Sequence, residues 1–117
     1  MNYAQYETSD WYEPVAAAVA ALQAHKDLSI TVVHADWCGD CTYTLPLLKK
    51  IVAALPAVKI VDVVVDRQKN DPQGIAKRLG VTNIPTLVVF KGAQEVGRIV
   101  ESPKATIEED IVAMLAK

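Results

Sequence analysis

Short apolar runs alternate with polar breaks along the chain, and the spacing within each run predicts strands or helices. Residues 28–35 and 58–65 are almost wholly apolar or β-branched, which is typical of strands. The run at 28–35 suits a sheet position that is covered on both faces. Residues 86–90 and 96–100 predict two more strands, joined by a short turn that contains Gly92.

Helical periodicity, together with capping and breaking residues, predicts four helices. Ser9 or Asp10 is the predicted N-cap of the first helix, and Ser102 is that of the last. Pro46 falls inside the second helix, where a missing backbone donor predicts a kink. Gly80 is the predicted stop of the third helix. The predicted helices cover residues 10–26, 42–55, 72–79 and 103 onward.

The order of the predicted elements indicates one α/β domain. They follow one another as helix, strand, helix, strand, helix, strand, strand, helix. Two strands joined through a helix are expected to run parallel, and the strands of a hairpin antiparallel. The economical arrangement is a central mixed sheet flanked by helices on both faces. Residues 10–117 are expected to form this domain, preceded by an N-terminal tail at residues 1–9.

Composition and charge narrow the classes of function. Of the 117 residues, 51% are hydrophobic and the formal net charge is −2, which fits a compact protein rather than a disordered chain. Because the chain has no basic cluster, nucleic acid and anionic membranes are not expected as partners. Residues 1–10 lack the pattern of a secretory signal, and the longest apolar stretch, 15–22, is too short to cross a bilayer. A cytoplasmic protein is therefore expected.

Cys38 and Cys41 are the only cysteines, and they lie between a predicted strand and a predicted helix. A sulfur at this turn faces the unpaired amides and the positive end of the helix, which stabilise a thiolate. In the cytoplasm such a pair is more often catalytic or metal-binding than structural. A zinc site needs about four ligands, and only His25, His34 and acids remain to complete one. A redox dithiol is therefore favoured over structural zinc or a static disulfide.

Several motifs, taken in order, resemble the thioredoxin family over residues 10–117. They are Ala35-Asp36-Trp37, Cys38-Gly39-Asp40-Cys41, Pro46 and Ile84-Pro85-Thr86. The resemblance implies a thioredoxin-like fold and a cis peptide bond at Pro85. It also implies that the Ile84 backbone lies beside Cys38, where a substrate strand pairs during exchange. The implied docking surface consists of Trp37, Gly39, Ile84, Pro85 and Gly92.

The two cysteines are expected to have different roles. Cys38 comes first, at the turn, so it is expected to be exposed and to act as the nucleophile. Cys41, one turn into the helix, is expected to be more buried and to resolve the mixed disulfide. No cofactor is expected. The expected partners are proteins that contain disulfides and a separate thiol or flavoprotein reductant, and the chain is expected to be a monomer.

Three departures from the family pattern bear on redox tuning and proton handling. The usual Gly-Pro between the cysteines is Gly-Asp, and Val32 and Asp62 stand where the family has a buried acid and a lysine. Asp62 is the candidate proton acceptor for Cys41, with a solvated or lysine-paired residue at a strand edge as the alternative. Asp40 suits the start of its helix but opposes a thiolate at Cys38, which favours a stronger reductant.

Three other conspicuous residues have ordinary structural explanations. His34 is expected on the same side of its strand as Val32, and a hydrogen-bonded core histidine is favoured over one that tunes the thiolate. Trp11 and Tyr12 are expected to pack against the core from the first helix.

Together these features predict a thiol–disulfide oxidoreductase that reduces protein disulfides. A binding or adaptor domain that keeps the fold but has lost turnover is the first alternative, because the residues that handle protons have changed. An exported disulfide oxidase or isomerase is the second. The reduction potential separates a reductant from an oxidant.

Overall fold

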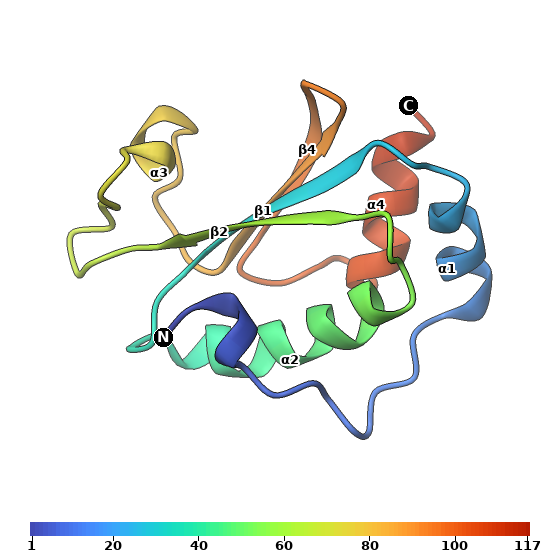
Figure 1. Cartoon of the computed structure of the whole chain (residues 1–117), viewed down its shortest axis with the longest axis horizontal. Helices are drawn as coiled ribbons and strands as arrows, with labels where there is room; N and C mark the ends of the chain where they lie inside the picture. The colour runs from blue at the N-terminus through green and yellow to red at the C-terminus, as the bar shows by residue number, and fades with distance from the viewer.

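The computed structural model describes all 117 residues and contains a four-stranded sheet with helices packed around it (Figure 1). The strands are β1 (Leu28–His34), β2 (Lys59–Val64), β3 (Thr86–Lys91) and β4 (Gln94–Val100). They lie in the order β2-β1-β3-β4. β1 runs parallel to β2 and antiparallel to β3, which is antiparallel to β4. The predicted pairing of parallel and antiparallel strands is confirmed.

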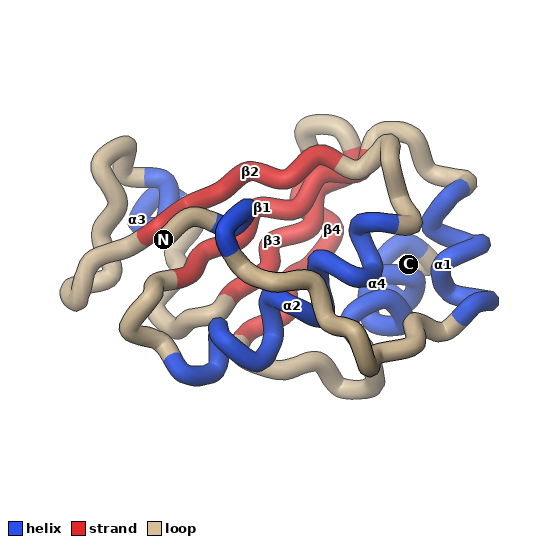
Figure 2. Tube along the Cα trace, turned by 60° about the horizontal axis from the view of Figure 1, so that its bottom comes forward, coloured by secondary structure: helices blue, strands red, loops and turns tan.

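The helices lie on both sides of this sheet. They are η1 (Tyr3–Gln5, a 3-10 helix), α1 (Ala16–Gln23), α2 (Gly39–Ala53), α3 (Ile75–Arg78) and α4 (Ile107–Leu115). Figure 2 shows η1, α2 and α4 in front of the sheet, with α1 beside α4. α3 lies beyond the end of β2, on the side away from α2 in Figure 1. Except for η1, the predicted order of elements is confirmed.

The core lies mainly between the sheet and α2. β1 is an inner strand, and Val32 and Val33 on its opposite faces are both fully buried. From α2, Leu45 and Leu48 are also fully buried. β2 is an edge strand with several exposed residues, although its sequence is nearly as apolar as that of β1. The Cys pair therefore follows the most buried strand of the sheet, and β2 flanks that strand on its open side.

The first helix begins later than predicted. α1 starts at Ala16, because the preceding backbone is held in a turn in which the Ser9 side chain accepts the N–H of Tyr12 at 3.1 Å. Tyr12 and the Val15 N–H then bind the buried carboxylate of Glu108. The prediction that residues 10–15 are helical was therefore wrong.

The two aromatic residues of this segment differ in their surroundings. Trp11 is 63% exposed, so the expectation that it packs in the core was wrong. Tyr12 is half-buried and donates its hydroxyl to Glu108 at 2.7 Å. Burial, followed by this carboxylate, raises the pKa of Tyr12 to about 12.

Two other helices also start later than predicted, in both cases because an aspartate binds the preceding backbone. The α4 N-cap is Thr106, whose hydroxyl accepts the N–H of Glu109 at 3.1 Å, and not Ser102. Asp110 accepts the backbone N–H groups before this cap. α3 begins at Ile75 rather than at residue 72, since Asp71 accepts amides of the first turn and of the residues just before it. Short-range carboxylate bonds of this kind compete with helical ones.

The N-terminal residues lie along α2 and the open edge of β2. Tyr6 is only 5% exposed, and Lys49 of α2 donates to its carbonyl at 2.7 Å. The backbone N–H of Tyr3 donates to Asp62 of β2 at 2.9 Å. Further along, the Ser9 N–H donates to the carbonyl of Pro46, inside α2, at 3.1 Å. Residues 1–9 are thus bound to the domain at several points.

Candidate functional site

The two cysteines lie at the start of α2, immediately after the central strand β1. Cys38 is the N-cap residue, and its Sγ accepts the backbone N–H of Cys41 at 3.2 Å. The Thr42 hydroxyl donates to the carbonyl of Cys38 at 3.3 Å. The sulfur thus occupies the position of a capping side chain, where free amides and the positive end of the helix dipole favour negative charge. The predicted placement of Cys38 at a strand-to-helix turn is confirmed.

Both cysteines are unpaired and buried, to different extents. Cys41 is fully buried, whereas Cys38 is 8% exposed. Cys38 was predicted to be exposed, and this was wrong, because it belongs to the packed cluster that contains Tyr6 and Ile84. The predicted order of burial is nevertheless confirmed.

Burial also sets the protonation of the inner thiol. It raises the pKa of Cys41 to about 12, with further contributions from its interaction with Cys38 and the negative charge of Asp40. In the reduced protein Cys41 is therefore a neutral thiol at physiological pH. A base must take its proton before this sulfur attacks a mixed disulfide.

Beside the Cys pair, an aromatic ring from the N-terminal segment covers the end of β1. We call the side of the pair formed by Tyr6, His34 and Asp62 its inner side. The ring of Tyr6 packs edge-on against His34, with centroids 5.4 Å apart, and its hydroxyl donates to the carbonyl of Ala35 at 3.3 Å. Burial, followed by the charges of Cys41 and Cys38, raises the pKa of Tyr6 to about 12. Tyr6 therefore lies within electrostatic reach of both thiols.

His34 joins this ring to an acid on the open edge of the sheet. Its Nε2 lies 2.5 Å from Oδ1 of Asp62, and its Nδ1 is buried without a hydrogen-bond partner. The imidazole is fully buried, so the prediction of a hydrogen-bonded core histidine is confirmed. The other oxygen of Asp62 accepts the N–H of Tyr3.

The surroundings of Asp62 fit the alternative expectation in part. It lies on the edge strand β2 with its side chain 30% exposed, as that alternative predicted, but its partner is His34 and not a lysine. Neither of its oxygens hydrogen-bonds Cys41. A role for Asp62 in accepting the Cys41 proton stays a prediction, and it now requires an indirect route.

The loop that contains Pro85 and the loop that follows β4 meet on the other side of the Cys pair. We call this side, which includes Asp40 and Glu101, the outer side. The Ile84–Pro85 peptide bond is cis, and the Pro85 carbonyl accepts the backbone N–H of Glu101 at 2.7 Å. Glu101 follows β4 and has a φ of +67°, in the left-handed region that favours glycine. Nothing in the sequence pattern indicated a role for this glutamate, which no motif includes.

Gly92 does not belong to this surface, so its predicted position was wrong. It lies in the β3–β4 hairpin, where its N–H donates to the carbonyl of Asp27 at 2.9 Å. Asp27 precedes β1, whereas Cys38 follows the other end of that strand. The predicted hairpin turn with a glycine is confirmed, since Gly92 has a φ of +61°, but it lies at the opposite end of the sheet.

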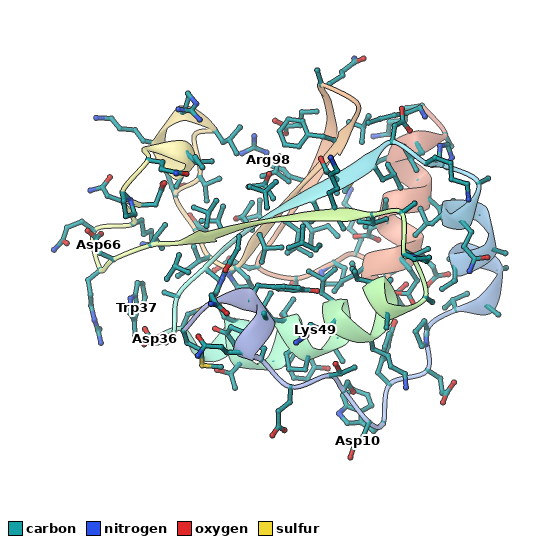
Figure 3. The ribbon with its side chains drawn as sticks, viewed as in Figure 1. Asp10, Asp36, Trp37, Lys49, Asp66 and Arg98 are labelled. Atoms are coloured by element: carbon teal, nitrogen blue, oxygen red, sulfur yellow. The ribbon has the colours of Figure 1, made fainter.

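Trp37 and Gly39 lie on either side of Cys38 in the chain. The Trp37 ring is half-buried, and the guanidinium of Arg67 lies 5.0 Å from its centroid. Figure 3 shows Trp37 next to Asp36 on the loop before α2. Nothing lies within 4 Å of the position that a Gly39 side chain would occupy, so the surface there is open.

A cavity of about 490 Å³ opens next to Asp40, between the first turns of α2 and the loop from β4 to α4. Elsewhere, no group of three or more His, Cys, Asp or Glu side chains is arranged to hold a metal ion. None of the helices combines the length and apolar character needed to cross a bilayer.

A family model described as thioredoxin matches residues 3–115 of this chain. The chain belongs to the thioredoxin family. Thioredoxin from Chlamydia muridarum is 39% identical over 66 residues, which cover 56% of this chain and 61% of that protein. Mitochondrial thioredoxin-3 of Saccharomyces cerevisiae is 36% identical over 86 residues, covering 74% of this chain and 65% of that protein. The chain thus spans less than two thirds of the length of these thioredoxins.

A solved structure supports the thioredoxin fold independently of close sequence similarity. Thioredoxin NaTrxh from Nicotiana alata has a TM-score of 0.62 and 24% identity, over 84% of this chain and 82% of that one. At this identity the similarity concerns the fold alone.

Proposed function

We propose that this thioredoxin-family protein is a thiol–disulfide oxidoreductase that reduces protein disulfides, with Cys38 as the nucleophile and Cys41 as the resolving thiol. One observation carries the proposal. The Cys38 sulfur caps α2 and accepts the Cys41 amide, while Cys41 lies one turn inward as a buried neutral thiol. A thiolate at the cap is stabilised for attack, and a second thiol lies close in sequence to displace what it captures.

The exchange proceeds in two balanced steps. The Cys38 thiolate attacks one sulfur of a substrate disulfide, that S–S bond breaks, and the other substrate sulfur leaves as a thiolate. Cys41 then loses its proton and attacks Cys38, which releases the second substrate thiolate. The substrate gains two electrons, and the protein is left with a Cys38–Cys41 disulfide. A separate thiol or flavoprotein reductant returns the two electrons.

Proton transfer from Cys41 is assigned to Asp62, acting through the buried His34 rather than by direct contact. The pairing of His34 with Asp62, the contact of the Tyr6 ring with His34 and the electrostatic reach of Tyr6 to the thiols support that route. In Asp62→Asn, the second step should slow while the first is unchanged. The matched control is Asp66→Asn, which alters an exposed acid that follows β2. A normal second step in Asp62→Asn would remove the role of Asp62.

Substrate backbone is proposed to dock beside Trp37, Gly39 and the Ile84–Pro85 bond. The cis geometry of that bond and the open surface at Gly39 support this placement. The partners are proteins that contain disulfides, and the protein acts as a monomer. Because the yeast relative is mitochondrial, the cytoplasmic location stays a prediction.

Insulin reduction tests the proposed function. Wild-type protein should accelerate the reduction by dithiothreitol, and Cys38→Ser should abolish that acceleration. Cys41→Ser should retain the first step and accumulate a mixed disulfide, detectable by mass spectrometry. A wild-type protein without activity would favour the adaptor alternative. A measured reduction potential near that of an oxidase, about −120 mV, would favour the oxidase.

A further inference from the structure

We propose that the cavity beside Asp40 receives a positively charged segment of the partner protein, next to the target disulfide, and that Glu101 sets this charge preference. The inference rests on the proposed function and identifies the class of substrate. It concerns the surface between α2 and the β4–α4 loop, where Asp40 also adjoins the two sulfurs.

Two acids face this cavity without partners in the protein. Asp40 and Glu101 both line it, and neither carboxylate takes part in a hydrogen bond or an ion pair. Asp62, by contrast, is bound on both oxygens. No lysine or arginine is among the lining residues of the cavity. Its charge is therefore uncompensated and is available to a cationic ligand.

The backbone holds Glu101 at this surface. Its N–H is bound to the carbonyl of Pro85, and its φ of +67° is unfavourable for any residue with a side chain. The glutamate is thus kept at a position where glycine is the favoured residue. Because Pro85 adjoins the proposed docking backbone, a segment that pairs there would pass close to this carboxylate.

Exposed aromatic rings extend the same surface along α2. Tyr43 and Trp11 are each 63% exposed, although aromatic residues of this size are usually covered. Tyr43 and Leu47 line the main cavity and also a neighbouring hollow of about 290 Å³, which adds Trp11 and Asp10. Asp10 projects from the loop below α2 in Figure 3.

The second hollow repeats the character of the first, since its lining includes acids and aromatic rings but no lysine or arginine. Aromatic faces attract ammonium and guanidinium groups, and their apolar surface packs against lysine and arginine stems. The two hollows therefore match a segment that carries basic residues together with apolar ones.

A pair of disulfide peptides tests this preference. The peptides are identical except that lysines or glutamates flank the disulfide. Pre-reduced protein is mixed with excess peptide, and oxidation of its dithiol is followed by tryptophan fluorescence. At low salt the lysine peptide should react about tenfold faster, and the ratio should approach one at about 1 M salt, where the screening length is short.

Variants locate the origin of the preference. Glu101→Gln should lower the ratio about threefold. Glu101→Lys changes the charge by two units and should bring the ratio to about one, whereas Asp40→Asn should lower it by a smaller factor. The matched control is Asp27→Asn, which removes one charge at the opposite end of β1 and should leave the ratio unchanged. Thermal unfolding of each variant checks that it is folded.

The outcomes separate the two proposals. If wild-type protein reacts with both peptides at equal rates, or if Glu101→Lys keeps the preference for lysine, the charge selection is overturned while the reductase function stands. If the reduced protein reacts with neither peptide nor with a small neutral aromatic disulfide, the reductase function fails and the inference fails with it.

Discussion

The inner and outer sides of the Cys pair are built differently. On the inner side, the polar atoms of Tyr6, His34 and Asp62 are bound to one another or to the backbone, with the exception of one imidazole nitrogen. On the outer side, Asp40 and Glu101 have no partner for their carboxylates. Bound polar groups stabilise the folded chain, whereas unbound ones at the surface stay available to ligands. We therefore expect the inner side to contribute mainly to the stability of the fold, and the outer side to contribute mainly to recognition of the partner protein.

Tyr6→Ala tests the inner side and has the largest expected effect. Removing a ring that is 5% exposed should lower the free energy of unfolding by about 3–5 kcal/mol, because it deletes buried surface and leaves a cavity beside His34. Tyr6→Phe should cost only about 1 kcal/mol, since the hydroxyl bond to Ala35 is long, at 3.3 Å. Urea denaturation measures both values.

Trp11→Ala is the matched control, because this ring is 63% exposed. It should change the free energy of unfolding by no more than about 0.5 kcal/mol. Equal effects at Tyr6 and Trp11 would mean that the N-terminal segment does not contribute to the stability of the inner side.

The buried thiol predicts that the reduced protein loses stability in alkaline solution. The pKa of Cys41 is raised from an ordinary value of 9.0 to about 12, so the folded chain holds a proton that the unfolded chain releases. This contribution is fully present below about pH 8 and is lost as the pH rises toward 12. Between pH 8 and pH 10 it should remove about 1.4 kcal/mol from the free energy of unfolding.

The comparison that isolates this effect is reduced wild-type protein against reduced Cys41→Ser. The tyrosines, including Tyr6 with its own raised pKa, titrate in both proteins and cancel in the difference. Urea denaturation at several pH values should therefore give a steeper loss for the wild type. Parallel profiles would show that Cys41 is not desolvated in the reduced state.

Residues close together in the sequence were the predictable part of this site. The strand, the turn and the helix around Cys38 follow from an apolar run, a CxxC spacing and a helical pattern. The strand pairing follows from the connections, because a helical crossover requires parallel strands and a short turn requires antiparallel ones. Pro85 was identified by its motif.

The unpredicted contacts join segments that are far apart in the chain. Tyr6 lies in a segment without periodicity, and its contact with His34 depends on the path of the chain across α2. Asp62 was expected to be buried because its strand is apolar, but an edge strand leaves it partly exposed. Glu101 was missed because its left-handed backbone is unusual for a glutamate, and Gly92 was misplaced because glycine is the usual residue in such a turn.

Glu101→Gly tests whether the left-handed backbone at this charged residue of the outer side lowers the free energy of unfolding. Glycine adopts a φ of +67° without strain, so this change should raise the free energy of unfolding by about 0.5–1 kcal/mol. Glu101→Ala removes the same charge but not the strain, and should give no increase. Thermal or urea unfolding distinguishes the two. Equal values for the two variants would show that the backbone at this position is not strained.

Asp40→Asn tests the outer side through the redox chemistry and has the smallest expected effect. Asp40 lies in the first turn of α2, and its negative charge opposes thiolate formation in the dithiol that it adjoins. Replacing it with a neutral amide stabilises the reduced form relative to the disulfide. The reduction potential should therefore rise by about 10–20 mV, which corresponds to about 0.5–1 kcal/mol for a two-electron couple. Equilibration with glutathione buffers measures this shift, and Asp27→Asn serves as the control at the far end of the sheet. An unchanged or more negative potential in Asp40→Asn would mean that this carboxylate acts on the partner protein alone and does not tune the sulfurs.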